Sequence, residues 1–383
     1  MKLVGIELVQ VEVPFAAAIR TAAGTHHTRS LLFVRVVTEE GEGWGECAAL
    51  REKTAVDPDV DEVAAAAAGR GVARLLGASA ARDGQVPAEA LVAQLFGSSP
   101  TDRMLAATFE MAVADAELRR DGRSLAQALG VGPGFESMAV GAAVGIPPDH
   151  ELGQLRAAVA QVVDRGAARV RLKIEPGWDL EPVRAVREAH PDLLLQVDAN
   201  GSYGANDAVH LSELSQFDVL CIEQPLPPAD LVAHAELARR LSVPICLDES
   251  LSSPRRVLDA LRNGACQVAC LKPGRLGGLR ATRLAHAACR EADVAVFVGG
   301  FFEAGLGRAS NLALAARLHQ DAPGMVGDLG DPATYLAVDP CGYPQVQEGW
   351  VRVPDHPGVG TWPDEVILGE LGAQRRWFPA TYT

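Results

Sequence analysis

Hydrophobic and polar positions alternate in the first part of the chain. Residues 3–8 alternate between two faces, a second extended run covers residues 30–37, and a turn at residues 39–41 leads into a third run at residues 43–47. This period of two is typical of strands, so we expect residues 1 to about 48 to form a small antiparallel sheet. Segments with a helical period follow at residues 59–76, 87–96 and 101–120, and the whole opening predicts an α+β unit.

The pattern changes at about residue 137, where short apolar runs begin to alternate with amphipathic segments. We predict helices at residues 180–190, 206–216 and 231–241. The strands that we predict lie at residues 169–174, 193–197, 219–222, 244–247, 267–271 and 294–298. Regular alternation of this kind indicates parallel strands joined by crossover helices.

A charged residue ends each of five successive predicted strands, namely Lys173, Asp198, Glu223, Asp248 and Lys272. The intervals between them are 25, 25, 25 and 24 residues, which is the repeat of one strand-helix unit. In a closed barrel the carboxyl ends of the strands meet around one mouth, whereas an open sheet would spread the five positions along an edge. The spacing therefore favours an α/β barrel in which these side chains are neighbours.

Composition and charge exclude several classes of protein. The chain has 383 residues, enough for two packed domains, and 48% of them are hydrophobic. Its net charge of -14 repels phosphate backbones, so we expect no nucleic-acid partner. We also expect no membrane association, because no apolar run approaches the roughly 18 residues of a span. Seven cysteines without a C-x-x-C pair and without a signal-type segment favour reduced thiols in a cytoplasmic protein.

Three carboxylates at neighbouring strand ends repel one another, and a divalent cation resolves that conflict. Asp198, Glu223 and Asp248 offer only oxygen ligands, which suit Mg²⁺ or Mn²⁺ rather than Zn²⁺. The alternative is that each acid caps the helix that follows it. Three acids in register, flanked by two lysines, favour the metal site.

The two lysines, Lys173 and Lys272, lie on either side of the acids. Partial desolvation lowers the pKa of a lysine, which lets it act as a base. Placed on opposite sides of a metal-bound carboxylate, the two would face both sides of its α-carbon. The favoured reaction is therefore proton abstraction next to a carboxylate; structural ion pairs with the acids are the alternative.

The motifs around these residues resemble the enolase superfamily, muconate-lactonizing branch, and within it the o-succinylbenzoate synthase/N-succinylamino acid racemase group. The matching segments are Arg171-Leu172-Lys173, Asp198-Ala199-Asn200, Glu223-Gln224-Pro225, Asp248-Glu249-Ser250 and Lys272-Pro273-Gly274-Arg275. The resemblance implies a modified (β/α)₇β barrel over residues 131–325. It also implies an α+β capping domain over residues 1–130, completed by about residues 326–383. Residues 20–25 resemble a capping loop that closes over substrate.

The resemblance also implies roles for the strand-end residues. Asp198, Glu223 and Asp248 would bind the metal, and Lys173 and Lys272 would be catalytic. For the synthase, Lys173 would remove the α-proton of a cyclohexadiene carboxylate before water leaves, giving 2-succinylbenzoate for menaquinone. N-succinylamino acid racemase is the alternative, in which both lysines would act; a dipeptide epimerase fits less well, because its last-strand Asp-x-Asp is here 328–330, Asp-Leu-Gly.

Further residues are expected to contact the carboxylate substrate or to orient the metal ligands and lysines. Arg171 replaces the usual first lysine of the family's Lys-x-Lys, and Arg275 matches a position associated with racemase-capable members. Phe301 departs from the usual methionine at the pocket wall. The complete set is Arg171, Asn200, Glu249, Arg275, Phe301 and Glu303, although helix capping by Asn200 and Glu249 and a loop contact by Glu303 are alternatives. A homo-oligomer is possible.

Overall fold

The computed structural model describes residues 1–21 and 24–381 and begins with a four-stranded antiparallel sheet. The sheet has the order β13-β1-β2-β3 and consists of β1 (Leu3–Thr21), β2 (Gly24–Thr38), β3 (Gly41–Glu46) and β13 (Gln374–Pro379). The predicted sheet is confirmed, but β1 and β2 are longer than expected. Their pairing includes Arg20 with Thr25, so backbone that we predicted as a loop is part of a hairpin, while residues 22–23 lie outside the described residues.

The helices predicted in the N-terminal part are confirmed, with one interruption. They are α1 (Val60–Ala66), a π-helix (Ala67–Gly71), α2 (Val72–Ala80), α3 (Glu89–Val92), a 3₁₀ turn (Ala93–Leu95), α4 (Pro100–Arg120) and α5 (Leu125–Leu129). Two glycines of β3 let α4 pack closely on the sheet. A Cβ at Gly43 would lie 2.2 Å from Ala116 N, and one at Gly45 would lie 2.0 Å from Thr108 O.

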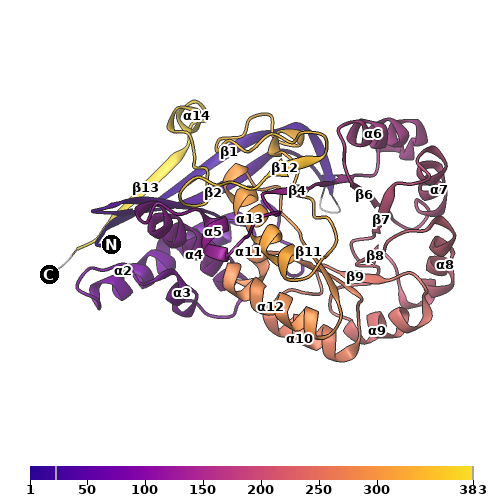
Figure 1. Cartoon of the computed structure of the whole chain (residues 1–383), viewed down its shortest axis with the longest axis horizontal. Helices are drawn as coiled ribbons and strands as arrows, with labels where there is room; N and C mark the ends of the chain where they lie inside the picture. Colours follow the sequence, from indigo (N-terminus) through magenta and orange to yellow (C-terminus); the bar gives the residue numbers. More distant parts are fainter. Residues whose placement is uncertain (22–23, 382–383) are drawn as a thin grey trace.

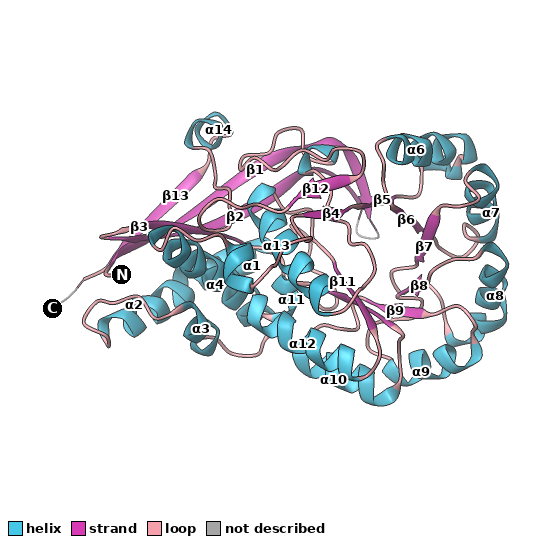
Figure 2. Ribbon diagram, in the orientation of Figure 1, coloured by secondary structure: helices cyan, strands magenta, loops and turns pink. Residues whose placement is uncertain are grey.

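Seven parallel strands form the second sheet, in the order β11-β10-β9-β8-β7-β6-β5. They are β5 (Gly141–Val144), β6 (Arg169–Lys173), β7 (Leu194–Asp198), β8 (Ile222–Glu223), β9 (Ile245–Leu247), β10 (Val268–Leu271) and β11 (Ala295–Val298). Helices lie along the outside of these strands, as Figures 1 and 2 show. The helices are α6 (Leu152–Asp164), α7 (Leu180–Ala189), α8 (Ala208–Ser212), α9 (Leu231–Arg240), α10 (Pro254–Asn263), α11 (Pro273–Leu276), α12 (Leu279–Glu291) and α13 (Gly305–Asp321).

An irregular segment joins the first and last of these strands and closes the barrel. Met325 N donates to Val296 O of β11 at 3.1 Å, and Gly141 N of β5 donates to Gly327 O at 2.9 Å. The segment thus takes the place of an eighth strand, and the predicted (β/α)₇β barrel with an α+β capping unit is confirmed as the fold class. The domain limits at residues 130, 325 and 326 stay predictions.

A few short elements complete the chain. A small antiparallel pair joins β4 (Ser137–Ala139) to β12 (Trp350–Arg352), and α14 (Glu365–Glu370) precedes β13. The helix predicted at residues 206–216 is divided, because 3₁₀ turns at Ala205–Asp207 and Glu213–Phe217 flank α8. Within the described ranges, no helix combines the length and the apolar character that a membrane span requires.

Buried carboxylates of the N-terminal unit attach it to two barrel helices. Glu46, at the end of β3, accepts hydrogen bonds from Ala304 N at 2.8 Å and Gly307 N at 2.7 Å, where α13 begins. Glu110 of α4 accepts one from Leu279 N at 2.6 Å, at the start of α12. Burial raises the pKa of both carboxyl groups to about 8. Each acid satisfies amide groups that a helix leaves unpaired at its first turn.

Gly278 makes the second of these contacts possible, and replacing it is expected to be costly. Its φ of +116° is strained for any other residue, and a Cβ there would lie 1.6 Å from Glu110 Oε2. We expect Gly278→Ala to lower the free energy of unfolding by about 3 kcal/mol, measured by urea denaturation. Gly264→Ala is the matched control, because its φ is also positive but the added Cβ meets open space; it should cost about 1 kcal/mol. Equal losses would contradict the account.

Candidate active site

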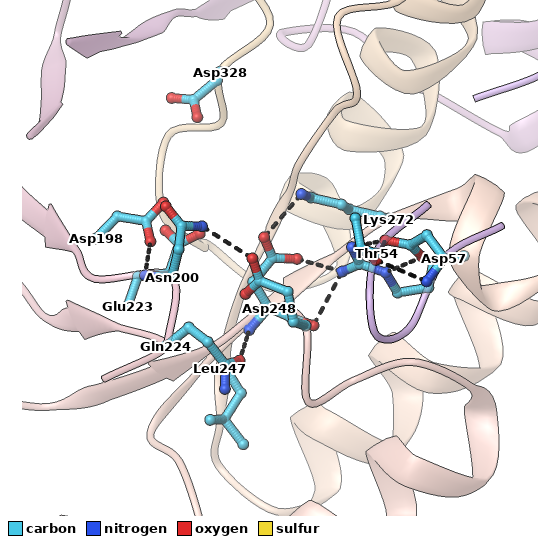
Figure 3. Close-up of polar contacts among 12 residues, drawn as sticks. Thr54, Asp57, Asp198, Asn200, Glu223, Gln224, Leu247, Asp248, Lys272 and Asp328 are labelled. Atoms are coloured by element: carbon cyan, nitrogen blue, oxygen red, sulfur yellow. Dashed lines mark hydrogen bonds and ion pairs between the residues drawn. The ribbon is translucent and has the colours of Figure 1, made fainter. Parts of the chain in front are cut away.

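The five charged residues of the sequence repeat lie together at the carboxyl end of the barrel strands. Lys173 ends β6, and its lateral neighbour Asp198 ends β7 and pairs in turn with Glu223 at the end of β8. Asp248 and Lys272 directly follow β9 and β10. Figure 3 shows four of these side chains, without Lys173, around one space. The three acids are 0–2% exposed, so their negative charge is buried at the barrel mouth, away from water.

The two lysines contact different carboxylates and have different surroundings. Lys173 Nζ donates to Asp198 Oδ2 and to Asn200 Oδ1, both at 2.6 Å, and its side chain is 30% exposed. Lys272 Nζ donates to Asp248 Oδ2 at 2.8 Å and lies 4.6 Å from the centre of the Phe301 ring, with 12% of the side chain exposed. Lys272 is therefore the more enclosed of the two.

A neighbouring acid controls the pKa of Lys272 in this arrangement. Burial lowers it, but the Asp248 carboxylate 2.8 Å away outweighs burial, so the net pKa is raised. The lowering that we expect for a lysine beside a bound metal stays a prediction.

Arg171 bridges the acids from inside the barrel. Its Nη1 atom donates to Asp198 Oδ2 at 2.7 Å and to Glu223 Oε1 at 2.8 Å, and its Nη2 atom lies 2.5 Å from Asp328 Oδ2. Asp328 is also paired with Arg169. Arg171 thus shares its single positive charge among three carboxylates. Its predicted contact with substrate stays a prediction.

Burial and neighbouring charges shift the acids in opposite directions. Burial raises the pKa of Glu223 well above its usual range, and the nearby Asp198 and Asp248 raise it further, against the effect of Arg171. Burial also opposes ionisation of Asp248, but Lys272 and Arg275 outweigh it and lower the pKa. Of these two acids, Glu223 is therefore the one whose negative charge is less compensated by positive side chains.

The residues present fit a hard divalent cation. Three buried carboxylates at adjoining strand ends supply the oxygen ligands that Mg²⁺ and Mn²⁺ prefer. Glu249 adds a buried Oε2 atom that has no hydrogen-bond partner, while its Oε1 accepts from Asn200 Nδ2 at 2.9 Å. Asn200 thus connects Glu249 to Lys173, and its role in orienting the lysine stays a prediction. A cation would relieve the repulsion that raises the pKa of Glu223.

Arg275 is held between the barrel and the N-terminal unit. Its guanidinium donates to Asp248 Oδ1 at 2.6 Å, and to Asp57 Oδ1 at 2.8 Å and Oδ2 at 2.6 Å. The side chain is 4% exposed and lies 5.0 Å from the centre of the Phe301 ring. Arg275 therefore connects Asp248 of the barrel to Asp57 of the N-terminal unit, two residues that Figure 3 labels.

The last two predicted residues lie in the loop after β11. Phe301 is 6% exposed and packs beneath Lys272 and Arg275. Glu303 accepts a hydrogen bond from Asn311 Nδ2 of α13 at 3.0 Å, which is the loop contact that we kept as an alternative.

Sequence reasoning missed residues that the structure places around the site. The residues next to Asp57 in the sequence do not indicate its role, because its partner Arg275 is 218 positions away. Gln224 Oε1 accepts from Asp248 N at 3.1 Å and Ser250 N at 3.0 Å, and so fixes the loop that carries Asp248. In the sequence, Asp328 served only to argue against a dipeptide epimerase. The motif Glu223-Gln224-Pro225 directly after a predicted strand was a signal that could have placed Gln224 beside the site.

Comparison with known families agrees with this fold. Residues 4–130 match the family described as mandelate racemase / muconate lactonizing enzyme, N-terminal domain, and residues 154–367 match the one described as enolase C-terminal domain-like. Together these matches cover most of the chain. The chain belongs to the mandelate racemase / muconate lactonizing enzyme family of the enolase superfamily.

Similar proteins carry two different names. The chain is 41% identical to an N-succinylamino acid racemase of Amycolatopsis sp, over 98% of this chain and 99% of that protein. It is 35% identical to an o-succinylbenzoate synthase of Geobacillus kaustophilus, over 92% of this chain and 91% of that one. An enolase superfamily structure from Listeria innocua has a TM-score of 0.90 at 31% identity and covers 100% of both chains. The resemblance to this synthase and racemase group is confirmed.

Loss of the carboxylate that holds Arg275 is expected to destabilise the protein. Asp57→Asn leaves the buried guanidinium with a neutral partner, so we expect the free energy of unfolding to fall by about 3 kcal/mol. Asp121→Asn is the control, because its pair with Arg120 is exposed on both sides and should contribute little to the free energy of unfolding. Denaturant titration monitored by circular dichroism measures both. A change below about 0.5 kcal/mol in Asp57→Asn would contradict the role given to this pair.

Proposed function

We propose that the protein is an o-succinylbenzoate synthase, a lyase that removes water from a cyclohexadiene carboxylate in menaquinone biosynthesis, acting in the cytoplasm. The observation that carries the proposal is the set of three buried carboxylates with a lysine on either side, at the ends of β6–β10. The shared ancestry with proteins named as this synthase supports it.

Asp198, Glu223 and Asp248 would hold Mg²⁺, with Mn²⁺ as a substitute. The cation would stabilise the negative charge that develops on the substrate carboxylate when the α-proton leaves. Arg171 would balance the remaining charge of the ligands from the barrel interior, and Arg275 would keep Asp248 in place.

Lys173 would act as the base. Its neutral Nζ atom takes the α-proton, and the electrons of the C–H bond form the new double bond. The hydroxyl group on the adjacent carbon leaves with the proton that Lys173 returns, as water. Asn200 and Asp198 would aim Lys173 at that proton. Lys272 would stay charged and stabilise the developing negative charge.

The unlike surroundings of the two lysines support a dehydration. Lys272 is enclosed by Asp248 and the Phe301 ring, which suits a fixed cation, whereas the more exposed Lys173 suits a base that must exchange its proton. N-succinylamino acid racemase is the second candidate. The 41% identity to a protein of that name favours it, and so does the buried Arg275.

Turnover on both candidate substrates separates these functions. With Mg²⁺ present, we expect the purified protein to dehydrate the cyclohexadiene precursor faster than it racemises an N-succinylamino acid. Lys173→Ala should lower the dehydration rate by roughly 10³-fold with the fold intact by circular dichroism. Faster racemisation would move the assignment to the racemase, and no turnover of either substrate would refute the proposed reaction class.

Arginine substitutions test the roles of the two lysines. An arginine keeps the positive charge but cannot act as a base. We expect Lys272→Arg to retain dehydration within about tenfold and to lose racemisation, which needs a second base. Lys173→Arg, the matched control, should lose both activities. Equal loss of dehydration in the two variants would contradict the assignment of Lys173 as the base.

A further inference from the structure

A thiol lies beside the carboxylates of the proposed magnesium site. Cys270 belongs to β10, whose register pairs Val268 with Cys246 and Ala269 with Leu247; the next position sets Cys270 beside Asp248. One ligand atom each from Cys270, Glu223 and Asp248 lie within 4.8 Å of one another. Three donors from neighbouring strands therefore face one point inside the barrel.

The thiol is buried, and a glycine on the adjacent strand leaves space for its sulfur. Cys270 is 2% exposed and makes no disulfide. Alternation along β10 turns it to the same face as Lys272. The adjacent strand end carries Gly299, where a Cβ would lie only 2.5 Å from Cys270 Sγ, so the missing side chain provides the space that the sulfur occupies. The sulfur thus fills the space beside Gly299, in a buried cluster with Cys246 and Phe297, and stays within 4.8 Å of the two acids.

The donor set differs in chemistry from the one proposed for Mg²⁺. Mg²⁺ prefers oxygen, whereas a thiolate favours soft or borderline cations. Bond lengths of about 2.3 Å to sulfur and about 2.1 Å to oxygen place donors on one zinc roughly 3.5 Å apart, so a contraction of roughly 1 Å is enough here. A carboxylate has about four lone-pair positions, so Asp248 can keep its bonds to Lys272 and Arg275 while it binds a cation.

We propose that Cys270, Glu223 and Asp248 form a second cation site, which takes a thiophilic divalent cation such as Cd²⁺ or Zn²⁺. On binding, the S–H bond of Cys270 breaks, the proton goes to solvent and a sulfur–metal bond forms, without any oxidation. Because the site uses two of the three carboxylates proposed for Mg²⁺, the two cations exclude each other. Inhibition by the soft cation rests on the proposed function, but binding does not.

Cadmium titration of the full chain, after removal of metals with a chelator, tests the site. We expect one Cd²⁺ per chain and an ultraviolet sulfur-to-cadmium charge-transfer band. Cys270→Ser should lose the band and bind Cd²⁺ at least about tenfold more weakly. Cys266→Ser is the matched control, because this buried thiol precedes the same strand at the opposite end; it should behave as the unsubstituted protein does.

Further readings keep the test decisive. Cys270→Ala, checked by circular dichroism, replaces the serine variant if that one does not fold. Inhibition by Cd²⁺ is measured relative to each variant's own Mg²⁺-supported rate. Cd²⁺ should inhibit the unsubstituted protein and Cys266→Ser. It should inhibit Cys270→Ser at least about tenfold less strongly. A band that persists without Cys270, or that never forms, overturns the cation site. A band lost with Cys270 in a protein that turns over neither substrate supports this site and refutes the proposed function instead.

Discussion

Three carboxylates that share a mouth sheltered from water require positive charge beside them, and much of the barrel interior is arranged to supply it. Asp198 and Glu223 receive it from Arg171, and Asp248 receives it from Lys272 and Arg275. These pairs leave Glu223 with a raised pKa, which a divalent cation would correct. The same constraint is consistent with a charged residue at the end of each strand from β6 to β8 and directly after β9 and β10.

The charge arrangement also joins the two parts of the molecule. Asp57 of the N-terminal unit holds the arginine that holds Asp248, so a metal-ligand candidate depends on a loop more than 190 positions earlier in the chain. Glu46 and Glu110 fix the starts of α13 and α12 from the same side. The packing of the capping unit and the geometry of the barrel mouth therefore depend on each other, because a shift of either unit would move buried charges away from their partners.

The sequence was sufficient for the parts of the fold that depend on period and spacing. A repeat of 24–25 residues places Lys173, Asp198, Glu223, Asp248 and Lys272 at successive strand ends, and the barrel follows from it. It could not show the full length of the β1–β2 hairpin, because the alternation that continues through Val9, Val11 and Val13 is lost over residues 14–29. It could not show the pairing of Asp57 with Arg275 either, which is purely tertiary. Nor could it show that Lys272 pairs directly with Asp248, which raises the pKa of the lysine.

The central claim is that three strand-end carboxylates act together as one site for a hard divalent cation. Titration of the metal-free protein with Mn²⁺, followed by electron paramagnetic resonance, tests it directly, since free Mn²⁺ can be counted. The account predicts one bound Mn²⁺ per chain, and affinity lowered at least about tenfold in Glu223→Gln, which keeps the side-chain shape but removes the charge. Unchanged Mn²⁺ affinity in that variant, or no binding by the unsubstituted protein, would contradict it.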